Sequence, residues 1–444
     1  MSIITLPLPI QLINGQIADA GQVMTDLNAI SSNVNANAAK NGVNSDITEL
    51  TALTSIVSGL SLTGASLFNC SFTLGAIYGS SIDGTTVGVT QPPGTNTTQL
   101  ATTEYVINQQ FASLVSSGLR NRIINGDHRI DQRNSGAAVT PTVTATFLTD
   151  RFQQLLTQPS KLTYQQVADA PPGFKFSLKC TVANQYNPIS TDVFIVRQRI
   201  EGQNIIDFQL GMATAQTITI TVWVKGSVPG TYNCAIKNLS ATRSYIGNIT
   251  VSTVWAKQTI TLTLETTGTW LTDNGTGISF SIDLGSGSNF NTTSGSWQSS
   301  NSFRTSSSVT FVNQINGSTL NFTGLQIEMG TVSTVFEQRP IGLELSLCQR
   351  YYSEIVGGAG QCISTTRAYI KAVLPVTMRV SPSINVLTAG SISDATGISL
   401  PATSNTILNP DTVSPLLLVG VGSGLVSGNG TILLGSRLGF SAEL

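Results

Sequence analysis

Four acidic side chains are the first candidates for chemistry in this chain of 444 residues. Glu201, Asp207, Asp273 and Asp283 lie in or beside stretches that alternate as β-strands do. Hydrolysis of a glycosidic bond needs two carboxyl groups that converge on it, one of them with a raised pKa. The sequence fixes no distance between these residues, and acids on the polar face of a strand are usually solvated. A glycan depolymerase that uses a carboxylate pair is for this reason only the alternative function, and the favoured function is given at the end of this section.

A second candidate for chemistry is His128, which follows Asp127 in a turn-like segment. No nucleophile and no set of metal ligands accompanies this pair, so we interpret the histidine as structural. The chain has no Gly-x-Ser-x-Gly elbow, and its glycine-rich stretch at 420–430 lacks the lysine of a phosphate loop. The 5 cysteines are scattered without a CxxC pair, which predicts free thiols rather than zinc ligands or a disulfide framework. We expect no catalytic residue, no cofactor and no metal.

Aromatic side chains beside polar ones could bind a sugar without cleaving it. Rings stack on the faces of sugars, and Asn, Asp and Gln bind the hydroxyl groups. Trp223 and Trp255 lie in strand-like stretches and are expected in the core, whereas two loop-like segments combine rings with polar residues. The predicted glycan-binding residues are Trp270, Asp273, Asn274, Phe290 and Trp297. For Trp270 and Trp297, a place in the core is an equally good interpretation.

The composition limits the partners. Charged residues are 10% of the chain, against about 25% in typical proteins. The 22 Lys and Arg balance 23 Asp and Glu, which argues against nucleic acid and anionic membranes as partners. The start, MSIITLPLPI, lacks the basic region of a signal peptide, and no apolar run reaches the ~20 residues of a membrane span. A neutral surface rich in Gly, Ser, Thr and Asn favours a β-rich oligomer.

The first 119 residues predict an elongated oligomer. After Pro7 and Pro9, apolar residues from Val23 onward follow heptad spacing, which favours a short parallel coiled coil over a helix packed on its own domain. From Leu60 to Val87 a large apolar residue recurs every five positions, as in a repeated unit that packs on its neighbours. A helix with an apolar stripe then ends at Gly118. The predicted trimer-interface residues are Val23, Leu27, Ile30, Val34, Leu67, Phe72, Ile77, Ile82, Ile107, Phe111 and Leu114.

The remainder is predicted to be mainly β. Ile218 to Val224 and Phe280 to Leu284 alternate apolar with polar residues, which indicates antiparallel strands with one buried face. Turns at about ten-residue intervals favour a β-sandwich of the jelly-roll type. Asn125-Gly126 predicts a tight turn in the first hairpin of this head. Residues 355–444 are predicted to form a second β region. Its apolar, glycine-rich part at 416–434 is expected to form either buried strands and turns of a small terminal sandwich or a strand bundle on a trimer axis.

Several motifs resemble bacteriophage tail-fibre and receptor-binding proteins with a carbohydrate-module-like jelly-roll head. They are the period-five stretch, NTTQLATTEYV at 96–106, RIINGD-x-RI-x-QR within 120–134, and QIE, FEQRP and LCQRYY within 324–352. In that family an aromatic residue often replaces His128, a leucine replaces Ile327 and a small aliphatic residue replaces Met329. The resemblance implies a trimeric fibre in which the large apolar residues of the shaft point inward.

The resulting prediction is a structural, homotrimeric tail fibre of a tailed bacteriophage. Its distal β domains would recognise a host surface glycan of lipopolysaccharide or capsule type, and its N-terminus would bind other tail or adaptor proteins. We expect the protein in the virion tail, assembled in the host bacterial cytoplasm. A bacterial surface adhesin would share the architecture but should carry a secretion signal. The predicted domains are a root at 1–45, a shaft at 46–95, a closing helix at 96–119, a head at 120–352 and a tip at 353–444.

Overall fold

The computed structural model describes residues 119–444 and, near the start of the chain, residues 21, 24, 25 and 27–29. The few described residues near the start are helical, in the segment where the sequence predicts a helix. Among the predicted trimer-interface residues only Leu27 is described, and it is 53% exposed in the single protomer. The rest of that set, the period-five shaft and the closing helix lie outside the described residues.

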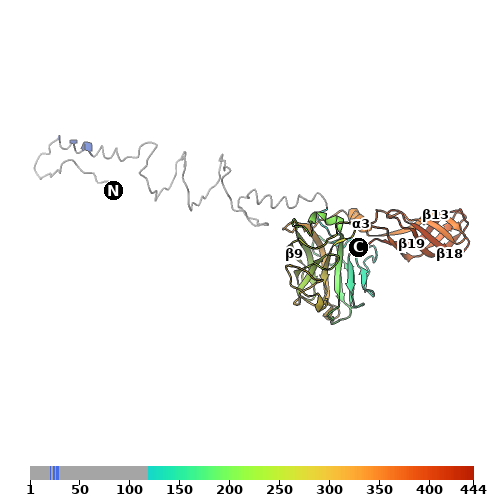
Figure 1. The fold of residues 1–444 in the computed structure, drawn as a ribbon, viewed down its shortest axis with the longest axis horizontal. Helices are drawn as coiled ribbons and strands as arrows, with labels where there is room; N and C mark the ends of the chain where they lie inside the picture. Colours follow the sequence, from blue (N-terminus) through green and yellow to red (C-terminus); the bar gives the residue numbers. More distant parts are fainter. Residues whose placement is uncertain (1–20, 22–23, 26, 30–118) are drawn as a thin grey trace. The chain divides into compact units, whose positions relative to one another are not determined.

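Residues 145–329 form a sandwich of two antiparallel sheets (Figure 1). The seven-stranded sheet has the order β1 (Ala145–Phe147), β2 (Gln153–Leu156), β5 (Phe194–Glu201), β10 (Thr276–Asp283), β7 (Gly230–Lys237), β8 (Ser244–Val251) and β11 (Trp297–Gln298). The five-stranded sheet has the order β3 (Leu162–Val167), β4 (Ser177–Val182), β12 (Thr319–Met329), β6 (Thr217–Gly226) and β9 (Ala256–Thr263). Three short 3-10 helices, η1 (Gly202–Phe208), η2 (Ser288–Phe290) and η3 (Phe311–Asn313), lie in the connections. The prediction of a mainly β fold with an antiparallel sandwich is confirmed.

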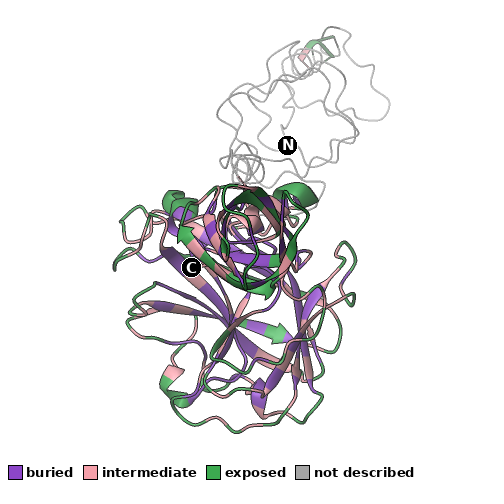
Figure 2. Cartoon of the chain, turned by 90° about the vertical axis from the view of Figure 1, so that its right-hand side faces the viewer, coloured by how far each residue is buried: buried purple, intermediate pink, exposed green. Residues whose placement is uncertain are grey.

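The alternation of apolar and polar residues along the strands builds the core of this sandwich. Ile218, Ile220, Val222 and Val224 of β6 are all buried between the sheets, where they meet residues such as Phe280 of β10. Removing such side chains from water contributes about 25 cal/mol for each Å² of apolar surface. Figure 2 shows the buried interiors of the strands in purple and the exposed loops in green. The other face of β6 therefore stays available for a different task.

One hairpin prediction is wrong. Residues 120–134 contain no strand, so no hairpin forms there. The tight turn at Asn125-Gly126 is present, because the carbonyl of Asn125 accepts the N–H of His128 (2.9 Å), but it is buried. Asn125 has a left-handed φ of 59°, and its side-chain nitrogen donates hydrogen bonds to the carbonyls of Ile130 (2.8 Å) and Asp150 (3.0 Å). A Cβ on Gly126 would lie 2.1 Å from the carbonyl oxygen of Leu325, so only glycine fits beside this strand. The Asn-Gly pair serves close packing on β12 instead of a hairpin.

The segments at 120–134 and 324–352, which carry the most distinctive sequence motifs, are held together, although about 210 residues separate them in the chain. After β12 the chain passes through the corner at 336–340 into α3 (Ile341–Gln349). Arg339 at this corner donates a hydrogen bond to the carbonyl of Ile123 (3.1 Å), and its guanidinium pairs with Glu344 (3.4 Å). The carboxylate of Glu344 also accepts the backbone N–H of Asn125. These motifs therefore form one buried polar cluster that stabilises the fold.

The last ninety or so residues form a separate antiparallel sheet with its own core. Its order is β13 (Tyr352–Ser364), β14 (Arg367–Lys371), β18 (Leu416–Val421), β17 (Ser399–Asn409), β16 (Ser391–Asp394), β19 (Gly430–Ser441) and β15 (Ser383–Thr388). Because β13 also pairs with β19, the sheet closes on itself into a barrel. Ile370, Leu417, Val419 and Phe440 fill its interior. A closed barrel replaces the small terminal sandwich that the sequence suggested, and the alternative of a strand bundle on a trimer axis stays a prediction.

Candidate functional site

An open cleft lies on the outer face of the five-stranded sheet. Its cavity volume is about 470 Å³, within the ~300–1,000 Å³ of typical ligand pockets. The floor comes from β6, β9 and β12, which are neighbours in the sheet, and the walls come from loops at 172–174 and 334–338. We call this cavity the aromatic cleft. Its lining residues are Pro172, Gly173, Phe174, Thr221, Trp223, Lys257, Gly324, Gln326, Thr334, Val335, Phe336 and Gln338.

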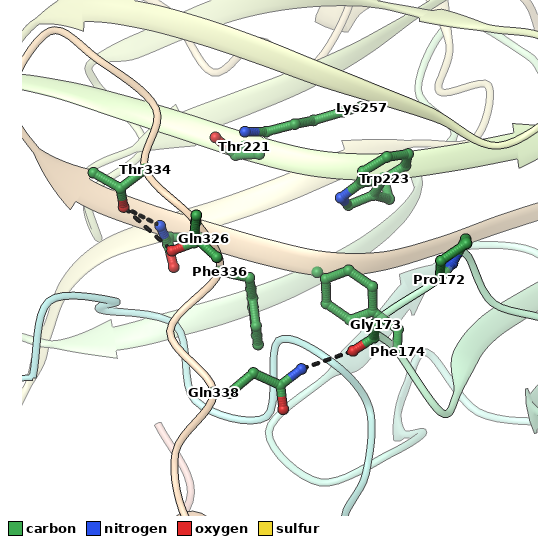
Figure 3. A pocket seen from close by; sticks show the side chains of 12 residues that line it. Pro172, Gly173, Phe174, Thr221, Trp223, Lys257, Gln326, Thr334, Phe336 and Gln338 are labelled. Atoms are coloured by element: carbon green, nitrogen blue, oxygen red, sulfur yellow. Dashed lines mark hydrogen bonds between the residues drawn. The ribbon is translucent and has the colours of Figure 1, made fainter.

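Three aromatic rings face the same hollow (Figure 3). Trp223 is carried by β6, whereas Phe174 and Phe336 come from the two wall loops and pack edge to face, with ring centroids 5.1 Å apart. Gly324 makes room for them at a bulge in β12, where the register with β6 shifts. It has a left-handed φ of 61°, and a Cβ there would lie 2.6 Å from Cζ of Phe174 and 3.0 Å from Cδ1 of Trp223. Only glycine combines this backbone with rings packed so closely.

Polar groups alternate with these rings. The side-chain nitrogen of Gln338 donates a hydrogen bond to the carbonyl of Gly173 (2.8 Å), which ties the two walls together. The side-chain nitrogen of Gln326 donates to Thr334 Oγ1 (3.1 Å), and Lys257 Nζ donates to Ser333 Oγ (3.0 Å). The hydroxyl of Thr221 is buried and has no hydrogen-bond partner among the described residues. The cleft thus presents fixed polar groups, one of them unpaired, beside stacking surfaces.

Trp223 differs from the other three tryptophans in its hydrogen bonding. The indole N–H groups of Trp270 and Trp297 donate to the carbonyls of Thr267 and Thr263, both at 2.9 Å, and that of Trp255 donates to Asp169 (3.1 Å). Within residues 119–444, no protein group accepts a hydrogen bond from the indole N–H of Trp223. The prediction that Trp223 and Trp255 are core residues is wrong, because both are only partly buried and neither belongs to the sandwich core.

The residues predicted for glycan binding fall into three separate places. Trp270 and Trp297 pack edge to face, 5.6 Å between centroids, and cover the edge of the sandwich core. Phe290 packs against Phe303 over the seven-stranded sheet. Asp273 Oδ1 accepts the N–H of Gly275 (2.8 Å) within a turn, and Asn274 accepts a hydrogen bond from Arg379 of the segment between β14 and β15 (2.7 Å). None of them lines the aromatic cleft.

The candidate carboxylates are each engaged by protein groups. Glu201 binds Arg350 (2.7 Å) and the hydroxyl of Tyr351 (2.7 Å), and Asp207 pairs with Arg122 (2.5 Å). Asp283, expected on a solvated face, is buried beneath the loop after β10 and accepts the N–H groups of Gly285 and Ser286 at 2.9 and 3.0 Å. Burial raises the pKa of Asp283, and Arg304 opposes that effect. No carboxylate lines the aromatic cleft.

The remaining candidates for chemistry are buried. His128 lies among the rings of Phe152 and Phe322, and burial lowers its pKa to about 3. The 4 described cysteines are free, as the sequence predicts for them, and all 4 are buried. In the described part of the chain, no three His, Cys, Asp or Glu residues gather closely enough to hold a metal ion. Over the same residues, no helix combines the length and apolar character that crossing a membrane would require.

Comparisons with known proteins give structural likenesses only. No family model and no curated protein matches the chain. One similar solved structure is a CBM4 (13% identity, 46% of this chain and 97% of that one, TM-score 0.24). Another is the enzymatically active domain of tailspike protein 4 of bacteriophage CBA120 (11%, 47% and 21%, TM-score 0.25). A third is a family 11 carbohydrate-binding module from Clostridium thermocellum (9%, 41% and 91%, TM-score 0.23). At such TM-scores these likenesses carry no argument about function, so the proposal below depends on the residues of this chain.

Proposed function

We propose that this chain binds a cell-surface glycan through the aromatic cleft, as the receptor-binding part of a homotrimeric bacteriophage tail fibre. The observation that carries the proposal is the combination of Trp223, Phe174 and Phe336 with polar side chains in one open cavity of about 470 Å³. Sugars offer apolar C–H faces edged with hydroxyl groups. Aromatic planes bind the faces, and amide and hydroxyl groups bind the edges.

Binding without cleavage is the chemistry that suits this cleft. Its polar side chains are hydroxyls, amides and one ammonium group, and its lining residues include no carboxylate. Glycoside hydrolysis by a carboxylate pair requires both acids at the bound sugar. The nearby Glu328 is buried and is occupied by Arg120 (3.2 Å) and the N–H of Thr334 (2.9 Å).

The role in a virion is supported by the motifs within 120–134 and 324–352 and by the heptad and period-five patterns of the first 119 residues. A fibre of this kind would be attached to other tail proteins through its N-terminus and assembled in the host cytoplasm. Three copies of a weak site gain effective concentration on a repeating glycan, so that overall binding exceeds that of one site.

The test is binding of the full chain to a panel of lipopolysaccharide and capsule oligosaccharides, followed by calorimetry with any ligand found. Trp223→Ala is expected to weaken binding of that ligand about tenfold or more, because one stacking plane is lost. Trp223 is partly exposed, so the variant should keep the wild-type unfolding temperature within a few degrees.

Trp255→Ala is the matched control, since Trp255 is also partly exposed but does not line the cleft. It should bind as the wild type does. Trp270→Ala tests the loop residues that the sequence favours. If Trp270→Ala abolishes binding and Trp223→Ala does not, the site lies at those loops and the proposal for the cleft fails.

A further inference from the structure

A second cavity lies on the outer face of the seven-stranded sheet, in the other layer of the sandwich from the aromatic cleft. It has a volume of about 250 Å³, below the ~300–1,000 Å³ typical of larger ligands. Its walls include β5, β7 and β10, Phe290 at the end of η2, and Asn301 in the segment after β11. This volume suits one sugar residue or one small anion.

Three cationic side chains surround this cavity. Arg197 and Arg199 are two residues apart on β5 and therefore point to the same face, and Lys237 ends β7. Strand β10 lies between them, with Ser279 directly opposite Arg199 on one side and Lys237 on the other. Because Ser279 is small, the side chains of Arg199 on β5 and Lys237 on β7 share open space above β10. We call the cavity that these three side chains surround the cationic pocket.

No side-chain carboxylate within residues 119–444 pairs with any of these cations. Arg197 donates to the side-chain oxygen of Gln153 (2.7 and 3.0 Å), and Lys237 donates to the side-chain oxygen of Asn301. Arg199 donates to a main-chain oxygen of Leu444 (2.7 Å), the last residue of this chain, so the terminal carboxylate is a partner of Arg199 alone among the three cations. The residues that line the pocket include no Asp, Glu or His. Elsewhere in this part of the chain, buried arginines such as Arg151 and Arg339 do pair with carboxylates.

The pocket is built at an energetic cost to the free protein. Burial and the charges of Arg197 and Arg199 lower the pKa of Lys237 to about 7. Burial likewise lowers the pKa of Arg197 to about 10. Buried charges are normally neutralised by a partner, so like charges gathered here create a positive potential that an external anion would relieve.

A further feature favours a ligand over a purely structural role. The rings of Phe290 and Phe303, 5.2 Å apart, form an apolar wall, and the ammonium of Lys237 lies 3.9 Å from the centroid of Phe303. A ring wall beside a cationic floor matches a sugar that carries a charged group.

We propose that the cationic pocket binds the carboxylate or phosphate group of an acidic sugar residue, and that the side chains of Arg197, Arg199 and Lys237 contact this group. The site is separate from the aromatic cleft and does not depend on the glycan proposed there. On an acidic surface polysaccharide, the two sites would read different features: the apolar sugar faces in the cleft and the negative substituents in the pocket.

The test is isothermal titration calorimetry of the full chain at constant ionic strength. The probes are glucuronate, glucose 6-phosphate, inorganic phosphate and uncharged glucose. Saturable binding of glucuronate or glucose 6-phosphate, without binding of glucose, is expected, and the stronger of the two identifies the charged group. Lys237→Met keeps an apolar stem on Phe303 and is expected to weaken binding about tenfold or more.

Lys371→Met is the matched control, because it removes the same charge from an exposed position on the barrel strand β14. It should bind the anions as the wild type does. Lys237→Met should also raise the unfolding temperature of the free protein, because it removes a buried cation next to two others. A purely structural lysine would have the opposite effect.

The pH dependence supplies a third readout. Because the free pocket holds Lys237 with a pKa of about 7, the anion binds most tightly below that pH, and its affinity should fall as the pH rises through 7. Arg197 and Arg199, the other charged side chains that line the pocket, stay protonated over this range. The profile is measured with glucuronate, because a phosphate group changes its own charge near pH 6, and it should be flat in Lys237→Met. The proposal is overturned if no charged probe binds saturably, or if Lys237→Met binds them as the wild type does. Trp223→Ala should leave anion binding unchanged, which keeps this test separate from that of the cleft.

Discussion

At the scale of single residues, His128 makes the stability of the fold depend on pH. Its Nδ1 lies 2.9 Å from Thr149 Oγ1, and its Nε2 is buried without a partner among the described residues. Burial lowers the pKa of the ring to about 3, so the folded protein holds it neutral. In the unfolded chain the ring takes up a proton near pH 6.5. The contribution of His128 to the stability of the fold is therefore complete above about pH 6.5, and it is lost as the pH falls towards 3.

His128→Phe is expected to reduce this acid sensitivity. Between pH 7.5 and 4.5 the free energy of unfolding should fall by about 2–3 kcal/mol less in the variant than in the wild type, since the phenyl ring takes up no proton. Urea denaturation at the two pH values measures the difference. The left-handed φ of 54° at this position disfavours Phe equally at both pH values and cancels in the comparison.

The same comparison removes the effects of other groups. Burial raises the pKa of Asp150 to about 6, which makes the fold more stable as the pH falls through that value, but this happens in both proteins. An unchanged pH dependence in the variant would show that the histidine is protonated in the folded state.

At the scale of elements, the corner before α3 is where one substitution should cost most. Arg339 is buried and bridges Glu337 (3.1 Å), Glu344 (3.4 Å) and the carbonyl of Ile123 (3.1 Å). Arg339→Met leaves the buried carboxylate of Glu344 without its cation. The expected loss is about 3–5 kcal/mol in the free energy of unfolding, measured by urea denaturation.

An exposed ion pair provides the control for this substitution. Arg437 pairs with Glu354 (2.5 Å) on the barrel, with the arginine side chain 50% exposed. Arg437→Met should change stability by less than about 1 kcal/mol. If the Arg339 variant does not fold, the double variant Arg339→Met/Glu344→Leu still tests the argument, because it removes both charges and should recover folding. Equal losses for Arg339→Met and Arg437→Met would contradict it.

The strands also explain what could be predicted from the sequence. The period of β6 correctly identified the buried face from Ile218 to Val224. The same period assigns Trp223 to the opposite face, so the signal for an exposed tryptophan was present, although strand propensity alone suggested a core residue.

Phe174 and Phe336 could not be found in this way, because they lie on loops 162 positions apart that meet only over the folded sheet. Likewise, the register that places Lys237 across from Arg199 depends on β10 and leaves no local pattern.

At the scale of the molecule, the barrel is fixed to the sandwich by charges. Glu443, just after β19, is nearly buried and pairs with Arg133 (3.0 Å) and with Arg151. Arg379 donates to the carbonyls of Asn274 (2.7 Å) on the sandwich and of Ala442 (2.8 Å) on the barrel. Buried pairs with several hydrogen bonds hold a fixed geometry well. The cleft and the pocket on the sandwich therefore belong to one unit with the barrel.

Oligomeric state decides whether such sites could act together on a cell surface. From the sequence we expect the heptad at 23–34 and the period-five stretch at 60–87 to pack their apolar residues against other copies of the chain. This hypothesis predicts a mass of three times 46.7 kDa by light scattering of the full chain. Leu27→Asp with Ile30→Asp places charges in the predicted seam and should lower that mass. The same variant should bind an immobilised polysaccharide about 10²–10⁴-fold more weakly than the wild type, while its affinity for a short oligosaccharide stays unchanged, because only the multivalent gain is lost. A monomeric wild type would contradict the fibre hypothesis: the period-five stretch would then have to fold on itself, and a single carbohydrate-binding module would become the better explanation of the cleft.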